Sequence, residues 1–214
     1  MTWTLVVTSH GRWPYLDQMM RSVADLDFEF DRCVYSFDGV HDIVLKTGMA
    51  APSDIVQLTT GSKRQGLTAN LTQAWGALAP DEWVFHVEED FLIHDAPLDE
   101  MRATLEANPT VANMVLVRQP WGAHEIAAGS VLAAQPYELL DRGTWLQHQG
   151  GFWLNPFVAH SSTLRQLTPG VETSLTKQCL RLGLSFGYWG SVTDPPRCTH
   201  IGAQGGMGSP EWLP

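Results

Sequence analysis

The sequence predicts an α/β fold in which a mostly parallel sheet is covered by helices on both faces. Over residues 4–90, short apolar runs rich in β-branched residues alternate with segments whose hydrophobic residues recur at helical spacing. The links between these segments are short, and strand–helix–strand units with short links form parallel sheets. A chain of 214 residues can bury one such core, so we expect a single domain.

The first half of the sequence carries the clearest elements. Pro14 suits the first turn of a helix that continues past Val23, and a second helix opens after the loop GSKRQG. Both helices carry their apolar residues on one stripe, as expected for helices that pack on a sheet. The expected strands are residues 4–8, 32–37, 54–58 and 83–87.

The second half of the sequence is less regular. Residues 97–107 are expected to form a helix and 111–117 a strand, and residues 171–182 form a helix that Gly183 ends. No clear pattern covers residues 119–143. We expect further strands at 150–154 and 186–192 and a flexible tail at 203–214.

Composition argues against several classes of protein. The net charge of −10 does not suit a protein that coats nucleic acid, and no apolar run approaches the ~18–20 residues of a membrane span. The N-terminal residues MTWTLVV lack the basic flank and cleavage site of a signal peptide. Three scattered cysteines suit a reducing compartment, so a cytoplasmic location is expected.

The loops that follow the predicted strands are the expected place for a ligand. In a parallel sheet, ligands bind beyond the carboxyl ends of the strands. Loops at residues 9–12, 38–39, 62–66 and 88–90 all lie at those ends. We therefore expect these four loops to converge on one crevice.

An acidic triplet stands in one of these loops. Glu88, Glu89 and Asp90 follow the apolar run WVFHV, and no basic residue lies next to them in the sequence. Like charges repel, and each raises the pKa of its neighbour. A divalent cation removes this repulsion, and oxygen ligands suit magnesium or manganese. A solvated acidic turn is the alternative, but the position after a buried strand favours a metal site.

Seven segments resemble, in their order along the chain, those of the GT-A glycosyltransferases, above all the large inverting family 2. TLVVTSHGRWPYLDQMMRSV is similar to the opening strand, loop and helix, YSFDG to the second strand, and WVFHVEEDF to the strand with the DxD-type metal motif. The acidic triplet and GGFWL also resemble the N-acetylglucosaminyltransferase I type. The resemblance covers roughly residues 3–202, and its remaining segments are SKRQGLTANLTQAW, GGFWL, VETSLTKQCLRLG and CTHIG.

The resemblance implies roles for individual residues. Residues 1–95 would bind a nucleotide sugar and residues 96–202 would face the acceptor. Asp90 is expected to be the primary metal ligand and His200 the late histidine that GT-A enzymes often place on the metal, although the triplet reads EED rather than DxD. The expected donor-binding residues are Thr8, Ser9, Arg12, Asp38, Lys63, Arg64, Gly66, Asn70, Glu88 and Glu89.

Most of these residues also fit a plainer interpretation. Asp38 suits an ordinary Asp-Gly turn, and Lys63 and Arg64 suit an exposed basic loop. His86 lies within a predicted buried strand, and we interpret it as a core histidine with satisfied hydrogen bonds. Trp121, Trp153 and Trp189 are candidates for an acceptor platform, although each also suits packing.

Glu172 is the candidate general base. It stands in the first turn of a predicted helix, where the helix dipole favours a carboxylate. An inverting transfer needs one base to take the proton of the acceptor hydroxyl group. The family usually carries paired acids here, whereas Thr173 follows Glu172, and an ordinary helix-start glutamate is the alternative.

Together these features predict a metal-dependent, inverting glycosyltransferase. The donor would be a nucleotide-diphosphate sugar, expected to be a UDP-sugar, and the cation magnesium or manganese. The acceptor would be a glycan, a protein or a modified nucleic acid. A non-catalytic module that binds sugar nucleotides is a second hypothesis. A nucleotidyltransferase is a third, although such enzymes usually open with a Gly-rich phosphate loop and SHGRW has one glycine.

Overall fold

The structure, a computed structural model, describes residues 2–39, 54–119, 123–129 and 131–202. The strands of its central sheet are β1 (Thr2–Ser9), β2 (Arg32–Phe37), β3 (Asp54–Thr59), β4 (Glu82–Glu88), β6 (Val111–Leu116), β8 (Leu140–Asp141), β9 (Trp145–His148), β10 (Phe157–His160) and β11 (Ser185–Trp189). A smaller sheet contains β5 (Phe91–Ile93), β7 (Arg118–Gln119) and β12 (Cys198–His200). The helices are α1 (Trp13–Ala24), α2 (Leu67–Gly76), α3 (Leu98–Ala107), α4 (Ala123–Ala128), α5 (Ser161–Leu164) and α6 (Glu172–Arg181).

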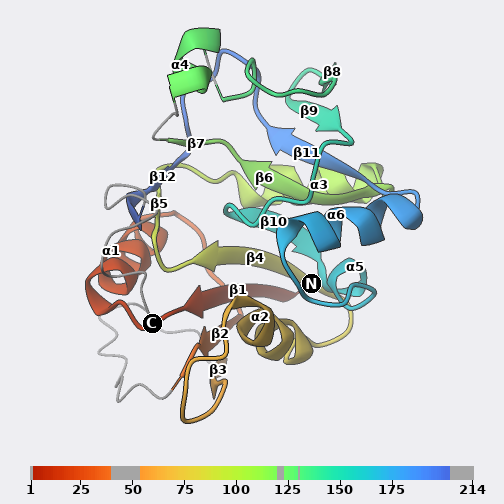
Figure 1. The fold of residues 1–214 in the computed structure, drawn as a ribbon. Coiled ribbons are helices and arrows are strands. Elements are labelled where there is room, and N and C mark those ends of the chain that lie inside the picture. Colours follow the sequence, from red (N-terminus) through yellow and green to blue (C-terminus); the bar gives the residue numbers. More distant parts are fainter. Residues whose placement is uncertain (1, 40–53, 120–122, 130, 203–214) are drawn as a thin grey trace.

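The central sheet has the strand order β3-β2-β1-β4-β10-β6-β11-β9-β8 (Figure 1). Its first four strands are parallel, as the sequence predicts. β10 runs antiparallel between β4 and β6, and therefore β4 and β6 point the same way. The predicted class, an α/β fold with helices on both faces of a large sheet, is confirmed, with the second half of the sheet mixed rather than parallel.

Helices cover both faces of the sheet. Leu5 and Val7 of β1 point to the face covered by α1 and α3, where they join a core with Leu16. Val6, between them, points to the opposite face, which α2, α5 and α6 cover, and joins a core with Leu71. Because β1 is buried on both sides, its sequence is a continuous apolar run rather than an alternating one.

The strand expected at residues 150–154 is not formed, so that prediction is wrong. The backbone amides of this segment bind α6 instead of a neighbouring strand: Phe152 N–H donates to Thr176 Oγ1 at 2.9 Å and Leu154 N–H to Glu172 Oε1 at 2.8 Å. The strand forms a few residues later, as β10. The unassigned stretch 119–143 contains α4 and β8, whereas the expected tail at 203–214 lies outside the described residues.

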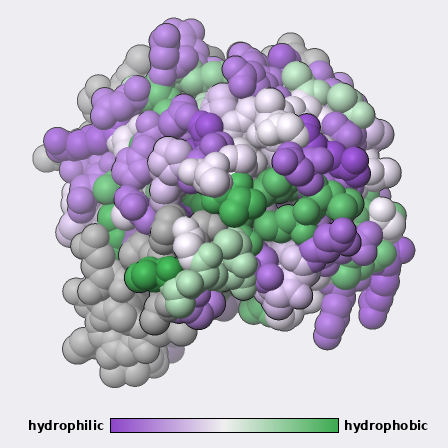
Figure 2. All heavy atoms as spheres, turned by 90° about the horizontal axis from the view of Figure 1, so that it is seen from above, coloured by the Kyte–Doolittle hydropathy of each residue, from purple (hydrophilic) through white to green (hydrophobic). Residues whose placement is uncertain are grey.

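Figure 2 shows hydrophobic residues as a band across the face seen from above, with polar residues on both sides of the band. Within the described residues, each helix falls short of the length and apolar character needed to cross a membrane.

We predict that Gly150→Ala destabilises the fold. A Cβ at this position would overlap the ring of Tyr137. The hydroxyl group of Tyr137 is hydrogen-bonded to Tyr188 and Trp153, and these bonds hold the ring in place. Overpacking of this kind costs about 1–3 kcal/mol of unfolding free energy, which urea denaturation would measure. Gly76→Ala is the matched control, since a Cβ there meets no atom within 4 Å and the helix end gains up to about 1 kcal/mol. Equal stability of both variants would contradict the prediction.

Candidate functional site

Three of the four predicted loops meet at the carboxyl ends of β1, β2 and β4. Asp38 N–H donates to the carbonyl of Ser9 at 2.8 Å, and Glu89 N–H donates to the carbonyl of Thr8 at 3.0 Å. The fourth loop joins them through Arg64, whose guanidinium donates to the carbonyl of His10 at 3.2 Å. The expected convergence of the loops is therefore found.

Arg12 lies against the acidic triplet. Its Nε atom lies 2.6 Å from Glu89 Oε1, and its Nη2 atom lies 2.8 Å from Asp90 Oδ2. The guanidinium also stacks over the ring of Tyr15, at 4.9 Å from the ring centre. The sequence places no basic residue beside the triplet, but the fold brings one there from the loop before α1.

The carboxylate of Glu89 accepts more hydrogen bonds than that of Asp90. Besides Nε of Arg12, it accepts the backbone N–H of Arg12 at 3.1 Å and the hydroxyl group of Ser9. Glu89 is buried, and a buried carboxylate with these donors has little capacity left for another ligand. Glu89 therefore ties the start of α1 to the end of β4.

Asp90 is shared between Arg12 and His200. His200 Nε2 lies 3.1 Å from Asp90 Oδ2, and the imidazole stacks on Phe91 at 4.6 Å between ring centres. Burial alone would raise the pKa of Asp90, but His200 and Arg12 outweigh it, and the pKa lies below its usual value. A Cβ on Gly202 would overlap Asp90 Oδ2, so this glycine lets the backbone pass directly over the carboxylate.

The side chains around Asp90 provide only some of the ligands that a divalent cation needs. Within the described residues, no group of three or more His, Cys, Asp or Glu side chains is arranged to hold a metal ion. Asp90 and His200 are a carboxylate and an imidazole in contact, and magnesium-type ions take their other ligands from phosphates and water. These two residues therefore fit such an ion, provided that Arg12 moves away from Asp90.

Asp38 organises the loop before α2. Its Oδ1 atom accepts the backbone N–H of Gln65 at 2.6 Å and the hydroxyl group of Thr60 at 3.0 Å, and its Oδ2 atom accepts Gly66 N–H at 3.0 Å. His10 Nδ1 lies 3.4 Å from the same carboxylate. Burial opposes ionisation, but these donors outweigh it and lower the pKa of Asp38.

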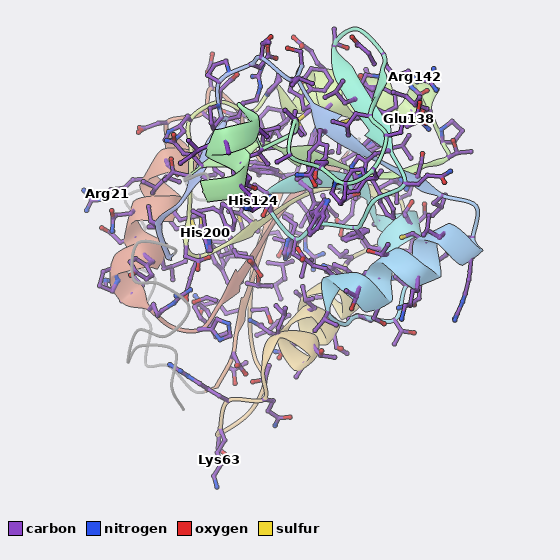
Figure 3. The ribbon with its side chains drawn as sticks, turned by 45° about the horizontal axis from the view of Figure 1, so that its top comes forward. Arg21, Lys63, His124, Glu138, Arg142 and His200 are labelled. Carbon is purple, nitrogen blue, oxygen red and sulfur yellow. The ribbon has the colours of Figure 1, made fainter. Side chains whose placement is uncertain are left out.

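The other predicted donor residues around this loop fall into two groups. Lys63 and Arg64 are exposed, and Figure 3 shows Lys63 extending away from the rest of the protein, whereas His200 lies within it. Gly66 has a positive φ of 85°, which a glycine adopts without strain, and precedes the first turn of α2. Asn70 is buried and donates to the carbonyl of Ser9 at 3.2 Å, so it links α2 to the end of β1.

Successive residues of β4 point to opposite faces of the sheet. Thr8 and His86 lie on the α2 side, with Oγ1 and Nε2 3.4 Å apart. Burial lowers the pKa of His86 to about 3. His86 is buried, as expected of a core histidine, but its Nδ1 has no hydrogen-bond partner among the described residues, so the expectation that its hydrogen bonds are all satisfied is wrong.

Glu88 lies on the same side as His86 and near Glu172 at the start of α6. It is half-buried and makes no hydrogen bond or ion pair to another described residue. Burial, with the charges of Asp90 and Glu172, raises the pKa of Glu88 to about 8. Burial also raises the pKa of Glu172, against the opposing effects of Leu154 N–H and the charge of Arg118. Both groups therefore keep a proton to higher pH than ordinary glutamates.

Sequence reasoning missed Arg118. This residue forms β7 directly after the buried strand β6, its Nη2 atom lies 3.3 Å from the buried Glu125, and its charge acts on Glu172. A signal was available, because the rule that ligands gather beyond the carboxyl ends of parallel strands applies to β6 as well.

An aromatic cluster lies beside Glu172. The ring of His148 stacks against those of Tyr137 and Tyr188, with ring centres 4.9 and 4.5 Å away. Trp153 Nε1 donates to the hydroxyl of Tyr137 at 3.3 Å. Trp153 is half-buried, whereas Trp189 is buried in the core and Trp121 lies outside the described residues.

Comparisons with known proteins support the fold. No protein-family model and no curated protein matches the sequence. A crystal structure of S. aureus TarS 1-349 matches over 95% of this chain and 61% of that chain, with a TM-score of 0.56 and 13% identity. A crystal structure of S. aureus TarS matches over 93% of this chain and 36% of that chain, with a TM-score of 0.56 and 12% identity.

The two matches show that this chain has a mixed α/β, GT-A-like fold similar to that of TarS, as its motifs predict. The chain spans less than two thirds of the length of both TarS chains.

We predict that Asp38→Asn destabilises the protein at neutral pH. An amide cannot accept all the N–H and O–H donors that the carboxylate accepts, and unpaired buried donors cost about 1–3 kcal/mol. Because the folded-state pKa is lowered, the carboxylate stabilises the fold above its unfolded pKa, and this effect disappears as pH falls through the folded pKa. The difference from wild type in urea denaturation should therefore shrink at acidic pH.

Asp27→Asn is the control for this prediction. Asp27 is exposed and has no hydrogen bond or ion pair to another described residue, so its replacement should leave stability nearly unchanged at each pH. A loss of stability in Asp38→Asn that does not depend on pH would contradict the role given to the ionised carboxylate.

Proposed function

We propose that this protein transfers a sugar from a nucleotide-diphosphate sugar to an acceptor hydroxyl group, with inversion at the anomeric carbon. The main support is that positively charged side chains and a candidate base lie on opposite sides of one sheet edge. Arg12 and His200 stand with Asp90 on the α1 side, whereas Glu172, with its raised pKa, stands on the α6 side. An inverting transfer needs positive charge at the leaving group and a base on the opposite side of the reacting carbon.

The donor diphosphate would lie at the α1 side of this edge. The nucleotide would occupy the loops that Asp38 and Asn70 hold together, within residues 1–95. We propose a UDP-sugar as the donor. Asp90 and His200 would hold magnesium or manganese, which supplies Lewis-acid stabilisation of the departing diphosphate when bound. Arg12, which lies against Asp90, would bind the same phosphates and add a second positive charge.

Glu172 would act as the general base. The acceptor oxygen forms a bond to the anomeric carbon, the bond from that carbon to the diphosphate oxygen breaks, and the diphosphate leaves with the bonding electrons. The hydroxyl proton passes to Glu172. Oε1 of Glu172 accepts Leu154 N–H, which fixes the carboxylate and leaves Oε2 available for this proton.

The acceptor would bind in the half of the chain formed by residues 96–202. Trp153 lies between two residues whose backbone amides bind α6, and Leu154 binds Glu172 itself. Its half-buried indole would stack on the acceptor beside the base. A glycan, a glycosylated protein or a modified nucleic acid would each bring a hydroxyl group and a ring to this position.

One observation favours a second function, that of a binding module without catalysis. Glu172 carries the hydrogen bond from Leu154, and no second acid follows it in the sequence. Incubation with a panel of nucleotide sugars and manganese, with release of nucleotide diphosphate as the readout, tests the proposal. Donor binding without transfer or hydrolysis would favour the binding module.

We predict that Glu172→Gln abolishes most of the transfer activity. Glutamine keeps the shape and the acceptor for Leu154 N–H but cannot take a proton, and loss of a general base costs about 10²–10⁴-fold in rate. Steady-state kinetics would measure this loss, and donor affinity by calorimetry should not change. Because the pKa of Glu172 is raised, wild-type activity should rise with pH above the range of an ordinary glutamate.

Glu100→Gln is a matched control, because Glu100 also stands in the first turn of a helix, α3, but is exposed and has no hydrogen bond or ion pair to the described residues of the site. It should keep full activity. NMR of the product gives an independent check on stereochemistry. A retained anomeric configuration, or full activity in Glu172→Gln, would remove Glu172 from the reaction.

A further inference from the structure

The three acids of the triplet have different surroundings. Glu88 faces Glu172 across the α6 side and has no hydrogen-bond partner among the described residues. Glu89 is saturated by Arg12 and Ser9. Asp90 is the one acid whose contacts, Arg12 and His200, both come from side chains that can turn away.

The backbone of Arg12 is held by Glu89, whereas its guanidinium can exchange one partner for another. Its backbone N–H and its Nε atom both bind Glu89, at 3.1 and 2.6 Å. Only Nη2 reaches Asp90, at 2.8 Å. The guanidinium is a rigid plane, so a side-chain rotation that releases Asp90 also breaks the contact between Nε and Glu89. The backbone N–H of Arg12 keeps its bond to Glu89 during this rotation.

The contact between Arg12 and Asp90 excludes a cation. The guanidinium and His200 both contact Asp90 Oδ2. A positive guanidinium within hydrogen-bond distance also repels a divalent cation. Conversely, a diphosphate at this edge attracts the guanidinium, because planar N–H donors match phosphate oxygens in pairs.

We propose that Arg12 is a phosphate-binding residue that pairs with Asp90 until a diphosphate binds, so that the diphosphate and the cation bind together and neither binds tightly alone. The incoming diphosphate takes Nη2 from Asp90, and the freed carboxylate with His200 then accepts the cation. This inference rests on the proposed nucleotide-diphosphate donor and adds the coupling between donor and cation.

Binding of manganese alone and of UDP alone provides the test, with no transfer reaction involved. Wild type should bind Mn²⁺ weakly without UDP, and saturating UDP should raise its affinity for Mn²⁺ at least about 10-fold. Arg12→Gln should bind Mn²⁺ without UDP about 10- to 100-fold more tightly than wild type, the range that a charge-assisted hydrogen bond accounts for. The same variant should bind UDP more weakly in the absence of metal.

Two further variants keep the test decisive. Arg12→Lys retains the charge but not the paired donors, and its affinity for Mn²⁺ should lie between those of wild type and Arg12→Gln; it serves if Arg12→Gln loses its circular dichroism spectrum. Arg21→Gln removes one charge from the exposed side of α1 and should bind both ligands as wild type does, so it controls for net charge.

Equal affinity of wild type and both Arg12 variants for Mn²⁺ alone would overturn the proposal. So would unchanged Mn²⁺ binding in Asp90→Asn, which would place the cation elsewhere. The proposed function fails in a different way: a protein with the expected coupling but without sugar transfer would retain the phosphate-binding role of Arg12 and lose the transferase assignment.

Discussion

The ligand edge of this protein depends on how two buried acids, Glu89 and Asp90, are neutralised. Carboxylates removed from water are costly unless charged donors surround them. Arg12 supplies the charge for both, and through it the loop before α1 is joined to the end of β4. The hydroxyl group of Ser9 and the imidazole of His200 complete the arrangement from β1 and β12. The contacts of these two carboxylates thus hold together three segments that are far apart in the sequence.

The pleat of β4 gives the edge two chemically distinct sides. Glu88 and Glu89 are neighbours in the chain but point to opposite faces of the sheet. On the α1 side, His200 and Arg12 lower the pKa of Asp90. On the α6 side, burial and mutual repulsion keep protons on Glu88 and Glu172 to higher pH. A reaction that separates negative charge from a transferred proton can use both sides at once.

The parts predicted from the sequence are those with a local pattern. The first four strands and their helices carry apolar runs or stripes, and the structure has them close to the expected positions. The segment 150–154 has the apolar character of a strand, but its amides bind α6, a tertiary contact that no local pattern indicates. The pairing of Arg12 with acids 77 and 78 residues away leaves no local trace either. The sequence does indicate Arg118, because this residue directly follows the predicted buried strand 111–117.

The place of β10 has a consequence for how the chain is made. This strand lies in the middle of the sheet, between β4 and β6, but it comes later in the sequence than both. During synthesis the edges of β4 and β6 that face β10 therefore stay unpaired until residue 160 has left the ribosome. Unpaired edges of buried strands readily join other chains. The nascent protein thus carries its largest risk of aggregation before its middle strand is available, and its first half cannot mature as an independent unit.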